Sequence, residues 1–181
     1  MSTEGSTKIR RIRANEPRVS RTLRVDSVAE LALSRLFGDL RCARQEAGLT
    51  QNEVAVGLPF RGRAISEWET GAMEPTLEHM FQWSRSLGRR LVIVGPDGDV
   101  RTGPARPWRG EPWEDFELRR LAVPLKNRRL ALGLTQDGLG WHVGVSRDSI
   151  GRWELARVRP RPIAVIVWAQ KLGCSVALRL A

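Results

Sequence analysis

The sequence predicts a mainly α-helical protein made of two tandem copies of one small helical unit, each followed by a short β-strand. The first observation is a repeat at a constant offset of 85 residues, which holds without an insertion over about forty positions. The second is the helical spacing of apolar residues within each copy, and the third is a β-branched run near the end of each copy. The repeated segments are Leu49-Thr50-Gln51 and Leu134-Thr135-Gln136, Ile65 and Ile150, Trp68-Glu69 and Trp153-Glu154, Trp83 and Trp168, and Leu87-Gly88 and Leu172-Gly173.

Capping residues and helix breakers divide the first copy into four helices and a strand. Ser27 and Glu30 form a Ser-x-x-Glu capping box for a first helix that continues toward Gly48. Thr50, with Glu53 three residues later, caps the second helix. The remaining elements follow a break at Pro59 and Gly62: a third helix over 64–69, a fourth over 76–87 and a strand over 90–94.

The second copy repeats this order. Thr135 caps its second helix, Gly144 breaks it and Ser146 caps the third, before a fourth helix over 163–172 and a strand over 176–180. The Pro- and Gly-containing stretch 103–107 indicates a linker between the copies. We therefore expect four segments: a basic flexible N-terminal arm (1–25), a first domain (26–96), a linker (97–112) and a second domain (113–181).

The charge predicts a polyanionic partner or an anionic membrane surface, because the chain carries a net charge of +10 and a pI near 11.3. The net charge is +5 over residues 1–25, −1 over 26–96, zero over 97–112 and +6 over 113–181. The sequence contains neither an apolar run that could span a membrane nor a signal peptide, so we expect a cytoplasmic protein. Cys42 and Cys174 are not at equivalent positions and are predicted to be free, buried thiols.

The doubled Leu-Thr-Gln and Ile-x-x-Trp-Glu motifs resemble the lambda-repressor/Cro-like helix-turn-helix proteins, the XRE family. The resemblance spans residues 36–94 and 121–180. It implies two tandem bundles of four or five helices, each of which lays its third helix in the major groove of double-stranded DNA. It also implies that Glu69 and Glu154 hold each helix-turn-helix together.

Carrying the family's DNA-contacting positions onto this sequence gives a set of candidate residues. Arg63 and Arg147 are the leading base readers, because a bidentate arginine–guanine contact gives roughly 1–3 kcal/mol of discrimination. Gln51 and Gln136 are expected to hold phosphates at the first turns of their helices. The remaining candidates are Arg61, Gly62, Ser66 and Glu67 in the first copy, Ser146, Asp148 and Arg152 in the second, and Arg10, Arg11 and Arg13 in the arm.

The two sets of readers differ chemically, so we expect an asymmetric or imperfectly palindromic operator. The first copy departs from the family pattern at Pro59, Arg61 and Gly62, which weakens the prediction for its recognition helix. In some antitoxins of this fold a C-terminal strand pairs across a dimer interface. By similarity, the strands 90–94 and 176–180 are predicted to pair antiparallel within one chain as a pseudo-dimer, with recognition helices about 34 Å apart. A homodimer is the alternative.

The other aromatic and titratable residues suggest no second site. Trp68, Trp83, Trp153 and Trp168 recur on inward helical faces and are predicted core residues. Trp108 and Trp113 flank the linker and are expected to fix it, whereas Trp141 is a candidate surface residue. His79 and His142 lack partners at metal-ligand spacing, and no catalytic motif is present, so the sequence predicts neither an enzyme nor a metal or cofactor site.

These observations predict a sequence-specific transcriptional regulator, most simply a repressor. One alternative is an antitoxin-type interaction module that binds a partner protein and autoregulates its operon. A third interpretation is that one copy has lost the ability to bind DNA and serves only as a scaffold.

Overall fold

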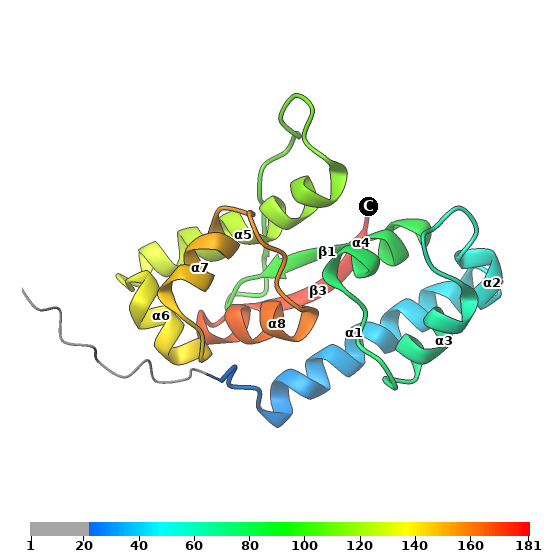
Figure 1. The fold of residues 1–181 in the computed structure, drawn as a ribbon, viewed down its shortest axis with the longest axis horizontal. Helices are drawn as coiled ribbons and strands as arrows, with labels where there is room; N and C mark the ends of the chain where they lie inside the picture. Colours follow the sequence, from blue (N-terminus) through cyan, green and yellow to red (C-terminus); the bar gives the residue numbers. More distant parts are fainter. Residues whose placement is uncertain (1–21) are drawn as a thin grey trace, which may run out of the picture.

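The computed structural model describes residues 22–181, so the arm residues Arg10, Arg11 and Arg13 lie outside the described part of the chain. Within this range the protein is mainly helical, with one small antiparallel sheet (Figure 1). The first copy comprises α1 (Ser27–Glu46), α2 (Gln51–Val54), α3 (Gly62–Glu69), α4 (Leu77–Ser86) and β1 (Arg89–Val94), followed by β2 (Val100–Arg101). The second copy comprises α5 (Trp113–Ala131), α6 (Gln136–Val143), α7 (Arg147–Glu154), α8 (Pro162–Lys171) and β3 (Ser175–Leu180).

Local capping explains where most helices begin. Thr50 and Glu53 form the predicted capping box: the Thr50 hydroxyl accepts from the Glu53 N–H at 3.2 Å, and the Glu53 carboxylate accepts from the Thr50 N–H at 2.7 Å. Thr135 and Ser146 cap α6 and α7 as predicted. Gly144 ends α6 in the left-handed conformation, with φ of 86°, which a residue without a Cβ adopts readily.

Three local predictions differ from the structure. The cap of α1 is Asp26 rather than Ser27, because the Asp26 carboxylate accepts from the Ala29 N–H at 2.8 Å. The third helix begins at Gly62, two residues before the predicted start, because Arg61 already acts as its N-cap residue and its carbonyl accepts from the Ala64 N–H at 2.9 Å. Strand β2 was not predicted; only two residues long, it carries too little pattern to recognise.

The sheet joins the two copies. Its strand order is β2-β1-β3, and β1 pairs antiparallel with β3 within the one chain, which confirms the predicted pairing. Val92 lies opposite Ala177, its own equivalent in the second copy, while Leu91 faces Leu178 and Ile93 faces Val176. A pair of equivalent residues facing each other defines a local two-fold axis, so the chain forms a pseudo-dimer around the Val92–Ala177 pair.

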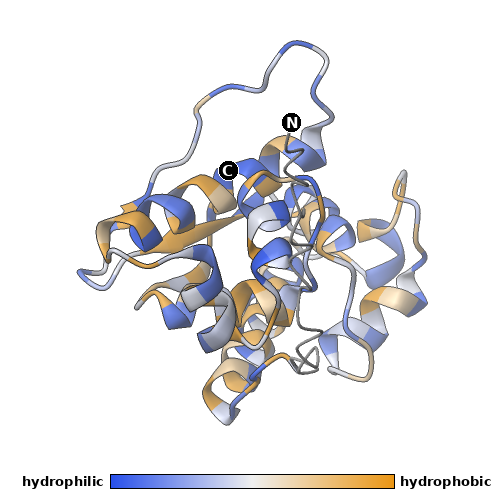
Figure 2. Ribbon diagram, turned by 60° about the vertical axis from the view of Figure 1, so that its left-hand side comes forward, coloured by the Kyte–Doolittle hydropathy of each residue, from blue (hydrophilic) through white to orange (hydrophobic). Residues whose placement is uncertain are grey.

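The hydrophobic core is continuous across both copies. Helix α1 packs against α8, and the equivalent helices α5 and α4 pack against each other. In Figure 2 the visible part of the sheet is mostly coloured as hydrophobic, and the helices around it alternate between hydrophobic and hydrophilic stretches. The four repeated tryptophans are buried, as predicted: Trp68, Trp83, Trp153 and Trp168.

The two cysteines have different environments. Both are free thiols, and Cys174 is buried, as predicted. Cys42 is exposed, so its predicted burial is wrong. It lies on the outer face of α1, whereas its neighbours Leu40 and Ala43 lie on the buried face. Burial raises the pKa of the Cys174 thiol.

Candidate nucleic-acid interface

Helices α3 and α7 are held by one buried face each and turn the other face outward. Ile65 and Trp68 are buried on α3, and Ile150 and Trp153 occupy the equivalent positions on α7, as predicted. Figure 1 places α2 and α3 at one end of the long axis and α6 and α7 at the other, with the sheet and helices α4 and α8 between them. The molecule therefore presents two similar outward helices at a separation fixed by the shared sheet.

An arginine, a glutamate and a glutamine bind α1, α2 and α3 together. Arg44 donates to both oxygens of Glu69, at 2.6 and 2.8 Å, and to the Leu49 carbonyl at 2.8 Å. The Gln51 side-chain amide donates to Glu69 at 2.9 Å. These bonds confirm that Glu69 holds the helix-turn-helix together. We call this arrangement the first bracket.

The second bracket repeats the first with every residue number increased by 85. Arg129 donates to Glu154 at 2.5 and 3.0 Å and to the Leu134 carbonyl at 2.6 Å, and Gln136 donates to Glu154 at 2.9 Å. The Glu154 side chain is fully buried, so the second bracket is less exposed to solvent than the first. Sequence reasoning missed the arginines of both brackets, although their 85-residue offset was the available signal.

The first bracket keeps its carboxylate charged. Burial by itself would raise the pKa of Glu69, but hydrogen bonds from Arg44 and Gln51, together with the Arg44 charge, lower it overall. The same hydrogen bond raises the pKa of Arg44. The charged pair under α3 therefore fixes this helix relative to α1.

The outer face of α3 carries an exposed ion pair. Arg63 donates to Glu67 at 3.0 Å, with 89% of the arginine side chain and 31% of the glutamate side chain exposed. Arg61 is exposed at the N-cap, where its side chain makes no capping bond, and Ser66 is half-buried. Gly62 is buried: an added Cβ would lie 2.9 Å from the Asn52 backbone nitrogen, so the start of α3 lies tightly against α2.

The outer face of α7 carries a different set of groups. Arg147 is exposed at the first position of the helix and makes no ion pair to another described residue. Arg152 pairs with Asp148 at 2.8 Å, and both side chains are more than half exposed. Ser146, the N-cap, accepts from the Ser149 N–H at 3.0 Å. The outward side chains of α3 and α7 are therefore chemically distinct.

Comparison with known families assigns both copies. A helix-turn-helix family model of the Cro/C1 (XRE) type matches residues 40–94, and a second helix-turn-helix domain model matches residues 120–181. The chain carries two helix-turn-helix domains in tandem. No curated protein and no solved structure matches the chain. Within residues 22–181 no helix is long and apolar enough to cross a membrane, and no group of three or more His, Cys, Asp or Glu side chains is arranged to hold a metal ion.

The segment that directly precedes α1 contacts the second helix-turn-helix domain before the chain continues into the first. The Arg24 N–H donates to the Val143 carbonyl at 2.9 Å, and the Arg24 guanidinium lies 5.1 Å from the centre of the exposed Trp141 ring. A Cβ at Gly144 would overlap the Thr22 carbonyl oxygen. Residues 22–24 are therefore seated on the α6–α7 turn, directly before the recognition helix of the second domain. No sequence pattern indicated this contact.

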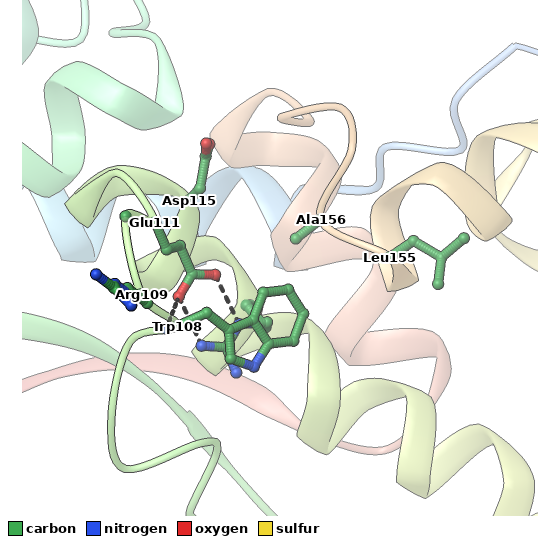
Figure 3. Close-up of a pocket in the computed structure, with 8 residues that line it drawn as sticks. Trp108, Arg109, Glu111, Asp115, Leu155 and Ala156 are labelled. Atoms are coloured by element: carbon green, nitrogen blue, oxygen red, sulfur yellow. Dashed lines mark hydrogen bonds and ion pairs between the residues drawn. The ribbon is translucent and has the colours of Figure 1, made fainter.

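The linker is fixed by a buried arginine at the edge of a pocket of about 300 Å³ (Figure 3). Arg119 donates to Glu111 at 2.7 and 2.8 Å, and its guanidinium lies 4.0 Å from the centre of the Trp108 ring. Trp113 packs against Arg85 and Phe81 of the first domain. Both linker tryptophans thus fix the connection, as predicted, and the far wall of the pocket is formed by residues that follow α7.

Proposed function

We propose that this protein is a sequence-specific double-stranded DNA-binding regulator of transcription that acts as a repressor in the cytoplasm rather than as an enzyme. Helices α3 and α7 enter successive major grooves of one asymmetric operator. The observation that carries this proposal is the pair of outward, arginine-bearing helices held on one body by the β1–β3 pairing. A single chain thereby supplies both recognition helices, and it binds one operator as a monomeric pseudo-dimer.

The residues divide into base readers and phosphate contacts. Arg63 and Arg147 read guanine, because both guanidinium groups are exposed near the starts of their helices. Gln51 and Gln136 approach phosphates through the backbone N–H groups at the starts of α2 and α6, since their side-chain amides donate to the brackets. The remaining contacts come from Arg61, Ser66, Glu67, Ser146, Asp148 and Arg152, and from Arg10, Arg11 and Arg13 of the arm, whereas Gly62 is buried against α2 and only positions the start of α3.

Selection of bound fragments from genomic DNA, followed by mobility shifts on the selected operator, tests this function. Arg63→Ala and Arg147→Ala should each weaken binding by about 1–3 kcal/mol, and each effect should map to one half-site. Arg106→Ala is the matched control, because Arg106 is exposed on the linker and should leave affinity unchanged. If no fragment is enriched over random DNA, the proposed function is wrong. If only Arg147→Ala weakens binding, the first domain is a scaffold.

A further inference from the structure

The two recognition helices carry ion pairs of opposite order at equivalent positions. In α3 the basic residue comes first: Arg63 pairs with Glu67 one turn later, at 3.0 Å. In α7 the acidic residue comes first: Asp148 pairs with Arg152 one turn later, at 2.8 Å. The fixed 85-residue offset superposes Arg63 on Asp148 and Glu67 on Arg152. The charge of the side chain at the first position is therefore reversed between the two domains, and so is the charge of its partner one turn later.

Helix stability explains only the order in α7. The N-terminus of a helix favours negative charge and the C-terminus favours positive charge, and an acidic residue placed before a basic one is the more stabilising i,i+4 order. Asp148 lies in the first turn of α7 and Arg152 in its last. Helix α3 has the reverse order, without an acidic residue in its first turn and without a side-chain cap. Its order therefore opposes its own helix dipole, so its ion pair is not placed to stabilise the helix.

All four side chains can be reached from solvent. The exposed fractions are 89% for Arg63, 31% for Glu67, 73% for Asp148 and 58% for Arg152. The opposite faces of both helices are buried through Ile65, Trp68, Ile150 and Trp153. Each ion pair holds its guanidinium and carboxylate side by side on the outer face, so the two groups reach a ligand together as one donor and one acceptor.

We propose that these two ion pairs are the determinants that make the half-sites different, each reading two bases in an order opposite to the other. Arginine donates to guanine O6 and N7, and a carboxylate accepts from the cytosine amino group. Through these pairs the first domain reads guanine and then cytosine along its helix, and the second domain reads cytosine and then guanine, beside the guanine that Arg147 reads. The inference rests on the proposed function and names the residues that set its specificity.

Exchanging the two residues of one pair tests the inference while keeping the ion pair. The double variant Arg63→Asp with Glu67→Arg gives α3 the order found in α7. Selected operators should keep the second half-site and change the first, so that the two half-sites become more alike in base order. On the wild-type operator the variant should bind about tenfold more weakly or worse, whereas it should bind its own selected operator as well as the wild-type protein binds its operator.

Two companion variants complete the test. The exchange Asp148→Arg with Arg152→Asp should change only the second half-site. The neutral variant Arg63→Ala with Glu67→Ala should bind but relax its preference at both first-half-site positions, because alanine can neither donate to guanine nor accept from cytosine. Thermal unfolding followed by circular dichroism should show the first exchange to be as stable as wild type or more so, because it places an acidic residue in the first turn of α3.

The outcomes separate this inference from the proposed function. If no protein form selects a DNA sequence, the proposed function itself fails. If the wild type selects an operator and the exchanged variants select the same one, the ion pairs do not set specificity and the inference is overturned. If exchange in either domain alters only the half-site of that domain, the inference is supported.

Discussion

At the residue scale, the buried carboxylates of the two brackets determine how firmly each recognition helix is held. Glu154 is completely buried and accepts from Arg129 and Gln136. Replacing it with glutamine leaves the Arg129 charge in the core without its counter-charge. Breaking a buried ion pair in this way typically costs about 3–5 kcal/mol.

We therefore expect Glu154→Gln to lower the free energy of unfolding by about this amount in urea titrations. Asp148→Asn is the control, because that side chain lies on the same helix but is mostly exposed, and the loss of its exposed ion pair and first-turn charge should cost no more than about 1 kcal/mol. Equal stability of the two variants would show that the second bracket does not hold α7.

The lowered carboxylate pKa values predict a loss of stability in acid. Hydrogen bonds from Arg119 lower the pKa of Glu111, and the first bracket lowers that of Glu69, in each case below the ordinary value of 4.5. A pKa that is lower in the folded state contributes stability above the unfolded-state value, and this contribution is lost as the pH falls through the folded-state pKa. We expect the free energy of unfolding to decrease as the pH is lowered below about 4.5. Glu111→Gln should reduce that dependence, and an unchanged acid profile in this variant would contradict the assignment.

Sequence patterns located the residues of the brackets only in part. Glu69 and Glu154 were identified through the repeated Trp-Glu motif, and their structural role is confirmed. Arg44 and Arg129 were missed: their 85-residue offset marks them as equivalent, but nothing in their local sequence indicates what they bind. Each pairs with a glutamate 25 residues away, and the packing of the helices reveals that partner.

At the element scale, the two helix-turn-helix units share equivalent brackets but begin and end their helices by different local means. In the second domain α6 runs for eight residues and ends at a left-handed glycine, and Ser146 then caps α7. In the first domain α2 is a four-residue helix, and α3 starts without a side-chain cap. The close approach of Gly62 to Asn52 takes the place of the missing cap in fixing the start of α3.

Two glycine substitutions test that difference. Gly62→Ala should lower the melting temperature and weaken binding at the first half-site, because its Cβ meets backbone as well as the Asn52 side chain. Gly151→Ala is the matched control on α7: its Cβ would lie 3.5 Å from Gln136, an ordinary van der Waals distance, and alanine favours the helix by roughly 0.5–1 kcal/mol. Differential scanning calorimetry should give melting temperatures that move in opposite directions. A Gly62→Ala protein as stable as wild type would remove the proposed role of this close approach.

Elements were predictable where their signals are local. Thr50, Thr135 and Ser146 were identified as caps because capping depends on residues three positions apart. The cap at Asp26 and strand β2 escaped prediction, the first because two adjacent residues could both act as caps, the second because its pairing with Ile93 and Val94 carries no pattern within so short a segment.

At the scale of the whole molecule, the β1–β3 pairing turns a sequence repeat into a pseudo-two-fold body. The repeat and the two β-branched runs located the strands, and the similarity to antitoxins whose C-terminal strands pair across a dimer interface predicted that they pair with each other. The symmetry is broken outside the bundles. Residues 22–24 are seated on the α6–α7 turn, whereas the linker is held instead by Arg119 and Trp108.

This asymmetry gives a prediction for the N-terminal arm. Residues 1–21 hold six Lys or Arg against two acidic residues, and the chain joins them to Thr22 beside the α6–α7 turn. We expect deletion of residues 1–21 to weaken binding to all DNA sequences alike. The deletion should also make the dependence of binding on salt less steep, because the slope of log K against log salt falls by about 0.9 for every phosphate that the arm no longer neutralises.

The arm should protect DNA on one side of the operator only. Because residues 22–24 are held against the second domain, deletion of the arm should abolish hydroxyl-radical protection in the flank beside the half-site that Arg147→Ala affects. The control Arg106→Ala with Arg109→Ala removes two exposed positive charges from the linker and should leave the footprint intact. An equal decrease of protection in both flanks would mean that the contact of residues 22–24 with the α6–α7 turn does not direct the arm to one side. A salt slope that does not change on deletion would mean that the arm binds no phosphates, and that the charge of the second domain alone accounts for non-specific binding.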